Sequence, residues 1–148
     1  LNGSVRVGYQ IRDFRGGRND SYSHLNATAS VAWPITRKLN LTGSIGRDFT
    51  TIATGASVDS LSAALRASYN FSRKIEFNGG LGYGRNRFLG TPPPERRDTF
   101  FSFDVGAAYR MNEHLQVGAS YNYFRNWSTL AFSDFDRQGF SVDISSRY

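Results

Sequence analysis

Polar and apolar residues alternate strictly along two neighbouring stretches in the middle of the chain. From residue 61 to residue 72, the larger apolar side chains hold the odd positions, and Ser, Ala, Arg and Asn hold the even ones. After Arg73 and Lys74, residues 75–84 alternate in the same way. A period of two on both sides of a short polar turn predicts a long antiparallel β-hairpin.

The turn of this hairpin is repeated along the chain. An aromatic residue, five further residues and then an aliphatic residue that opens a new alternating stretch occur at Trp33 to Leu39, Tyr69 to Ile75 and Tyr109 to Leu115. A unit that recurs in this way indicates one supersecondary element used several times. We therefore expect a series of hairpins.

The same alternation predicts a chain of strands without a helix. The strands are expected at residues 1–12, 22–33, 39–49, 61–72, 75–84, 99–109, 114–125 and 139–148. Tight turns alternate with long loops rich in Gly, Pro and Asp, such as the loop that contains Pro92, Pro93 and Pro94, which cannot donate to a ladder. The tight turns share one side of the sheet with both termini.

An even number of strands, with short turns on one side and long loops on the other, is typical of bacterial outer-membrane β-barrels. Tilted strands of about 9–11 residues span a bilayer. Backbone groups in lipid need internal partners, so the sheet is expected to close. We predict an all-β fold, an eight-stranded antiparallel up-and-down transmembrane β-barrel, as a single domain over residues 1–148. The expected location is the outer membrane, with both termini periplasmic.

Composition supports an enclosed polar face. The chain has 16 arginines but only 2 lysines, Lys38 and Lys74, and both lysines lie in tight turns. Arginine is weakly hydrated and forms two-bonded pairs, which suits an enclosed polar space better than open water. The chain has no cysteine, which excludes disulfides and thiolate metal sites. We assign no cofactor and no metal.

The aromatic residues indicate which face meets lipid. A soluble barrel would place the apolar face inside, whereas a membrane barrel carries aromatic girdles at both interfaces. Aromatic side chains collect at the strand ends, and we predict a turn-side girdle of Trp33, Tyr69, Phe71, Tyr109 and Tyr148. The loop-side girdle is expected to contain Phe49, Tyr83, Phe88, Phe101 and Tyr123.

Charged residues in the polar phase form the predicted lumen network. Its members are Arg6, Arg12, His24, Asp48, Arg66, Glu76, Asp104, Arg110, Asp143 and Arg147. From the register that each tight turn implies, we expect Asp48 opposite His24. The same argument places Glu76 diagonal to Arg66.

Asp143 would lie opposite Arg6 if the last strand pairs with the first. That match favours closure of the chain on itself, in which case the charges would fill the interior, because eight strands leave room only for side chains. The many inward Gly, Ser and Ala residues favour a wetter lumen or a wider barrel.

An enzymatic alternative rests on His24 and Asp48. An aspartate that orients a histidine is a general-base arrangement, and omptin-like surface proteases use such a pair near the outer rim. A structural polar pair is the simpler interpretation. Barrel lipases and deacylases need Ser, His and an acid on the lipid-facing rim, and His114, which is inward and on the turn side, fits neither. We assign no catalytic residue.

Arg47, Arg85, Arg87 and Arg125 lie in the lipid-facing phase at the loop-side ends of their strands. Because arginine binds phosphate through two hydrogen bonds, we predict that they form a rim that contacts lipopolysaccharide. Basic residues are divided between interior and rim, so we expect no nucleic-acid partner. Exposed loop aromatics at Phe132 and Phe135 would bind a partner or sugar, or fold over the barrel mouth.

In size the chain resembles the small OmpX/OmpA-type barrels. Residues 69–77, residues 109–117 and the closing strand that ends at Tyr148 are similar to the β-barrel porin type 2 family, whose members are larger and many of which accompany polysaccharide export. The closing strand also resembles the signal through which the barrel-assembly machinery recognises its substrates.

The leading function hypothesis is a non-enzymatic outer-membrane barrel with a structural, adhesive or narrow-pore role. The alternative is the C-terminal part of a larger porin associated with exopolysaccharide secretion and with a polysaccharide-export partner. An omptin- or deacylase-like enzyme is the third hypothesis.

Overall fold

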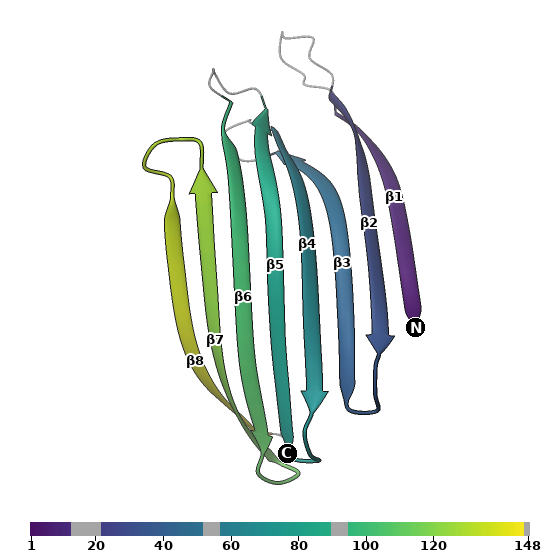
Figure 1. The fold of residues 1–148 in the computed structure, drawn as a ribbon, viewed down its shortest axis with the longest axis vertical. Coiled ribbons are helices and arrows are strands. Elements are labelled where there is room, and N and C mark those ends of the chain that lie inside the picture. The colour runs from purple at the N-terminus through teal and green to yellow at the C-terminus, as the bar shows by residue number, and fades with distance from the viewer. Residues whose placement is uncertain (13–21, 52–56, 90–94, 147–148) are drawn as a thin grey trace.

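Eight antiparallel strands make up the fold (Figure 1). The computed structural model describes residues 1–12, 22–51, 57–89 and 95–146, with the side chains at 10–12, 22–24 and 51 left undescribed. The strands are β1 Asn2–Arg12, β2 Tyr22–Pro34, β3 Leu39–Thr51, β4 Ser57–Asn70, β5 Ile75–Leu89, β6 Arg97–Arg110, β7 Leu115–Ser128 and β8 Phe135–Ser146. Within these ranges, no helix is long and apolar enough to cross a membrane.

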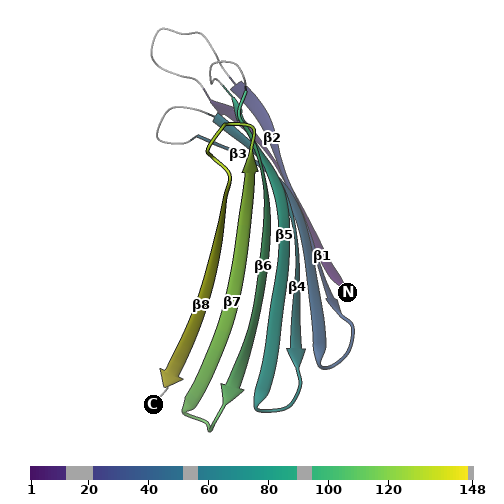
Figure 2. The same cartoon turned by 60° about the vertical axis from the view of Figure 1, so that its left-hand side comes forward.

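The strands form one sheet in chain order, and each strand contacts only its neighbours in the sequence. The predicted up-and-down order of eight strands is confirmed. The sheet is curved and open, with β1 and β8 at its two edges (Figures 1 and 2). The expected closure, with Asp143 opposite Arg6, does not occur in the described part of the chain.

The tight turns are closed by a repeated side-chain contact. Thr36 Oγ1 accepts hydrogen bonds from the backbone N–H groups of Lys38 and Leu39, at 3.1 and 2.9 Å. Ser72 Oγ and Asn112 Oδ1 accept the equivalent pairs of bonds in the other two turns. Serine, threonine and asparagine favour such turns because their short side chains reach nearby backbone donors.

The turns set a register two residues away from the expected one. Ala27 lies opposite Arg47, and this is the last pair of the β2–β3 ladder, so Asp48 does not face His24. Glu76 lies opposite Asn70, whereas Arg66 lies opposite Gly80. Both expected charge pairs were therefore wrong. Each of these two turns is centred one residue later in the chain than pairing of its flanking aromatic and aliphatic residues would place it.

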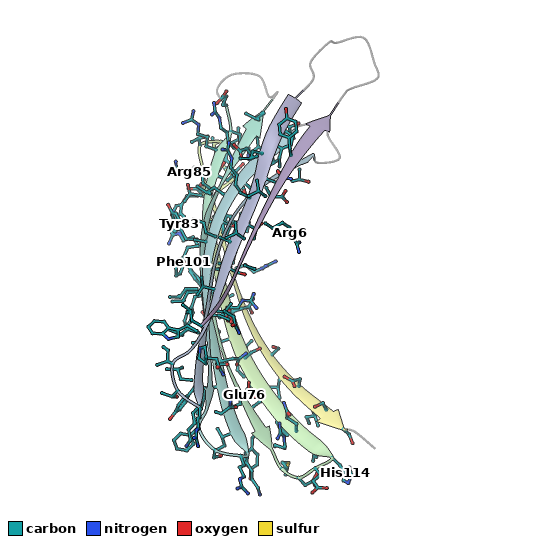
Figure 3. The ribbon with its side chains drawn as sticks, turned by 90° about the vertical axis from the view of Figure 1, so that its right-hand side faces the viewer. Arg6, Glu76, Tyr83, Arg85, Phe101 and His114 are labelled. Atoms are coloured by element: carbon teal, nitrogen blue, oxygen red, sulfur yellow. The ribbon has the colours of Figure 1, made fainter. Side chains whose placement is uncertain are left out.

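The two phases of the alternation separate onto the two faces of the sheet. Figure 3 shows Tyr83, Arg85 and Phe101 on the convex face and Arg6 on the concave face. Apolar side chains on the convex face are open to the surroundings: Val5 is 76% exposed and Phe140 is 73% exposed. This arrangement agrees with the prediction that the apolar phase faces outward.

Strands continue further on the loop side than the alternation predicted. β4 begins at Ser57 and β5 ends at Leu89, and the two ends are paired with each other. β8 begins at Phe135, four residues before the expected start. The hydrophobic pattern fades at these ends because charged residues appear, but a backbone ladder does not depend on side-chain polarity.

Candidate functional site

The concave face carries the predicted lumen charges. Those with described side chains are Arg6, Asp48, Arg66, Glu76, Asp104, Arg110 and Asp143, and all are exposed. No ion pair joins two of them within the described residues. The side chains of Arg12 and His24, together with residues 147 and 148, lie outside the described part. The structure thus collects the charges on one face without linking them to each other.

Glycines on the concave face lie directly opposite larger residues. Asp104 is paired with Gly80, and a Cβ at position 80 would collide with the Asp104 carboxylate. Gly118 stands in the same relation to Asp143, and Gly106 to Asn78. These three polar side chains therefore lie flat over the neighbouring strand and do not project from the concave face.

A basic hollow lies at the turn-side end of the concave face. Its volume is about 690 Å³, and its lining includes the cations Lys38, Arg73, Lys74 and Arg110. Glu76 is the one carboxylate among the described residues that line it. Lys38 Nζ donates a 3.1 Å hydrogen bond to the carbonyl of Phe71, which joins two of the tight turns. The hollow will attract anions because its positive charges outnumber its negative one.

The convex face bears aromatic side chains at the turn-side ends of the strands and further along them toward the loops. On the turn side, the Phe71 ring makes edge contacts with Tyr69 and Phe77, with ring centroids 6.4 Å apart in each case. On the loop side, Tyr83 lies opposite Phe101. Trp33, Tyr109 and Tyr123 of the predicted girdles share this convex phase. Their place at the membrane interfaces stays a prediction.

Two predicted girdle residues lie elsewhere or are covered. Phe88 shares the concave phase with Asn86, and the guanidinium carbon of Arg96 lies 4.4 Å from its ring centroid. Its assignment to the lipid-facing girdle was wrong. Phe49 keeps the convex phase but is only 5% exposed. Tyr148 lies outside the described residues.

The four rim arginines fall into two classes. Arg47 forms a two-bonded ion pair with Asp59, and Arg87 forms an ion pair with Glu95 at 2.8 Å. Arg85 and Arg125 are exposed and have no ion pair among the described side chains. The guanidinium of Arg125 lies 5.2 Å from the Trp127 ring centroid.

A buried acid that sequence reasoning missed joins two strands at the loop side. Asp98 is 4% exposed and forms an ion pair of 2.6 Å with Arg96. Ser128 of β7 donates its hydroxyl proton to the same carboxylate. Thr129 adds two bonds to the backbone of Arg97. These contacts fasten the start of β6 to the end of β7.

Three aromatic rings lie on the concave face, and sequence reasoning missed two of them; the third, Phe135, was expected in a loop but begins β8. Phe100 and Phe124 stack with centroids 5.9 Å apart, and Phe124 lies 5.7 Å from Phe135. The sequence contained a signal for the first two, since Phe100 and Phe124 occupy even positions in strands whose other even positions are small or polar. Among the described residues, no group of His, Asp and Glu could hold a metal ion.

Comparison with known proteins identifies the family. No curated protein sequence matches the chain. One similar solved structure is Ail, the attachment invasion locus protein of Yersinia pestis, with 16% identity over 99% of this chain and 97% of that chain and a TM-score of 0.38. A family model described as Putative beta-barrel porin 2 matches residues 1–148, which confirms the resemblance seen in the strands. The chain belongs to this family and is a β-barrel protein of the bacterial outer membrane.

Proposed function

We propose that the concave face lines a water-filled pore and that the eight strands are one arc of its wall. The observation that carries this proposal is the state of the concave charges. Arg66, Asp104 and Arg110, among others, are exposed and unpaired with one another. Charges left in this way are stable only in contact with water. A plugged barrel would instead join them in a packed interior.

The proposed pore is wider than eight strands. Unpaired backbone groups at β1 and β8 would be costly in lipid, so both edges need partners there. An eight-stranded closed barrel has an interior just wide enough for side chains to fill. On the concave face of this sheet, Asp104 and Asp143 lie over glycines of the neighbouring strands instead of extending into such a space. Further strands at the two edges, as in a larger porin, therefore suit the sheet better than closure on itself.

The basic hollow gives the proposed pore a preference for anions. Lys38, Arg73, Lys74 and Arg110 would concentrate anions at the turn-side mouth, since a cleft lined by one sign of charge raises the local concentration of the opposite ion. The remainder of the concave face carries both signs of charge. The pore is thus expected to be weakly rather than strictly selective.

Conductance in planar bilayers tests the pore. Protein purified whole from outer membranes should give stable steps of current and a reversal potential that favours chloride over potassium. Arg73→Gln should reduce the chloride preference. Arg37→Gln is the matched control, because Arg37 occupies the same place in the preceding turn but does not line the hollow. Absence of current above that of protein-free bilayers would contradict the proposal and favour a structural or adhesive role.

We also propose that the tight turns and both termini face the periplasm. Short turns on that side and longer loops outside support this orientation. The chain has no cysteine, so single cysteines can be introduced at Arg73 in a tight turn and at Ala131 in a loop. On intact cells, a thiol reagent that does not cross the membrane should label Ala131→Cys and not Arg73→Cys. The reverse pattern would contradict the orientation.

A further inference from the structure

Two cations lie side by side at the turn-side ends of β5 and β6. The backbone N–H of Arg110 donates a 2.7 Å hydrogen bond to the carbonyl of Lys74, one step beyond Ile75 and Tyr109, the pair that ends the ladder on that side. Both side chains line the basic hollow. Side chains that are directly opposed on neighbouring strands have Cβ atoms about 4.5–5.5 Å apart. We call Lys74 and Arg110 the cation pair.

No carboxylate neutralises the cation pair within the described part of the chain. Lys74 and Arg110 are both exposed, and neither forms an ion pair with a described side chain. Like charges that face each other across neighbouring strands destabilise a sheet. An anion bound between the two side chains removes this repulsion, so the arrangement favours a bound anion.

Further hydrogen-bond donors surround the cation pair. Lys38 Nζ donates one N–H to the carbonyl of Phe71, which holds the ammonium beside the hollow and leaves two of its three protons for a ligand. Arg73 and the side-chain amides of Asn70 and Gln116 line the same hollow. An oxyanion accepts hydrogen bonds at several oxygens at once, and a guanidinium binds two of them through its planar fork. The hollow therefore suits an oxyanion better than a chloride ion.

Glu76 determines which oxyanion the hollow accepts. It lines the hollow two residues after Lys74, is exposed, and forms no ion pair with a described side chain. An ionised carboxylate only accepts hydrogen bonds, so it repels an anion that has no proton to donate. Inorganic phosphate keeps an O–H group at neutral pH and can donate it to Glu76. Sulfate and phosphate diesters have no such group.

We infer that the cation pair and Glu76 form a binding site for inorganic phosphate at the turn-side mouth of the lumen. The Arg110 guanidinium would bind two phosphate oxygens and the Lys74 ammonium a third, while the protonated oxygen donates to Glu76. The site rests on the proposed function, because phosphate reaches the hollow only if the concave face is wet. It adds a preferred substrate to the pore: hydrogen phosphate, ahead of chloride and sulfate.

Equilibrium binding tests the site without requiring current. The whole protein is held in a non-ionic detergent, and inorganic phosphate and sulfate are each titrated by calorimetry. Phosphate should bind saturably and about tenfold more tightly than sulfate, and Arg110→Gln should weaken phosphate binding about tenfold, because charge-assisted hydrogen bonds are lost. Glu76→Gln should bring the two affinities together, because the amide can donate to sulfate. Tighter sulfate binding is a gain that a misfolded variant would not give.

Arg37→Gln is the matched control, because it removes the same charge from a tight turn whose arginine does not line the hollow. It should leave both affinities unchanged. Equal binding of phosphate and sulfate by the wild-type protein, or a phosphate affinity that Arg110→Gln does not alter, would overturn the site.

Phosphatidylglycerol added to the micelles distinguishes free phosphate from a lipid head group. Its phosphate is a diester without an O–H group, so it should not displace inorganic phosphate, and displacement would overturn the inference in favour of a lipid site. Saturable phosphate binding in a protein that carries no current would uphold the site and contradict the pore. Current without saturable phosphate binding would uphold the pore and contradict the site.

Discussion

Arg47 of β3 and Asp59 of β4 hold each other through two hydrogen bonds on the convex face. Arg47 Nε lies 2.9 Å from Asp59 Oδ1, and Arg47 Nη2 lies 2.7 Å from Asp59 Oδ2. A guanidinium in this arrangement has its best donors occupied by a carboxylate. It would have to break that pair before binding the phosphate of a lipid, so Arg47 contributes to the sheet more than to the rim.

Arg85 and Arg125 are therefore the rim residues expected to bind lipopolysaccharide. Arg85 follows Tyr83 on the convex face in the direction of the loops, close to the aromatic residues of the predicted loop-side girdle (Figure 3). Replacing both arginines by Gln should reduce the lipid A that co-purifies with the protein by about tenfold, because charge-assisted hydrogen bonds to phosphate are lost. Mass spectrometry of lipid A per mole of protein measures the effect.

A charge-matched control comes from the opposite end of the strands. Arg37 and Arg73 lie in tight turns, and replacing both by Gln removes the same charge without touching the rim. Lipid A retention should then equal that of the wild-type protein. An equal loss in both double variants would show that retention follows net charge alone and would remove the rim as a site.

Gly84 is expected to be intolerant of any side chain. Gly84→Ala should destabilise the protein by about 1–3 kcal/mol, since the added methyl meets the Phe100 ring and the Leu61 carbonyl. In a Phe100→Ala background the cost should shrink but remain above zero, because the carbonyl is still 2.9 Å away. Urea unfolding in lipid vesicles gives these free energies of unfolding.

Gly43→Ala provides the comparison for that series. No atom lies within 4 Å of a Cβ built at position 43, so alanine there should be neutral or stabilising by about 0.5 kcal/mol. A loss of stability at position 43 as large as that at position 84 would show that backbone flexibility, and not contact with Phe100, decides both results.

The turns show why the sequence predicted the strands but not their register. Thr36, Ser72 and Asn112 occupy equivalent positions in three similar turns, so the repeat was visible in the sequence. The register depends on which backbone N–H groups those side chains capture, and alternation does not contain that information. A shift of one residue in the turn moves every cross-strand pair by two, which separated Asp48 from His24.

Each turn should depend on its side-chain oxygen. Ser72→Ala leaves the N–H groups of Lys74 and Ile75 without their acceptor and should cost about 0.5–1.5 kcal/mol of unfolding free energy. Ser72→Thr and Ser72→Asn should be close to neutral, because threonine and asparagine accept the equivalent backbone hydrogen bonds in the other turns. Urea unfolding in vesicles measures all three. A loss in the Thr and Asn variants equal to that in the alanine variant would contradict the role.

The candidate sites were predictable to different degrees for physical reasons. Phase alone placed Arg85 and Arg125 on the convex face, and position along the strand placed them at the loop side. The phase of a residue does not reveal its partners, so the sequence pattern does not distinguish Arg47, which pairs with Asp59, from Arg85. The contact between the rings of Phe100 and Phe124 could not be predicted from their phase alone, because the two residues are 24 residues apart in the sequence.

Glu95 at the loop side should respond to acid. Hydrogen bonds from Arg87, followed by the charge of that guanidinium, hold the pKa of Glu95 below its ordinary value. A carboxyl with a depressed folded pKa stabilises the fold above its unfolded pKa, and that contribution is lost as the pH falls through the folded pKa. The Glu95 contact is thus complete at neutral pH and is lost only in acid.

Carbon-13 NMR of glutamate-labelled protein in micelles measures this titration, with Glu95→Gln to assign the resonance. Glu95 should titrate below the ordinary glutamate pKa of about 4.3. Arg87→Gln should raise its pKa, although Arg97, whose guanidinium lies 3.5 Å from the same oxygen, will keep part of the shift. An ordinary pKa in the wild-type protein, or a pKa indifferent to Arg87→Gln, would mean that the ion pair does not persist in solution. Arg87 would then be as free as Arg85 to bind phosphate, and the division of the rim into two classes would no longer hold.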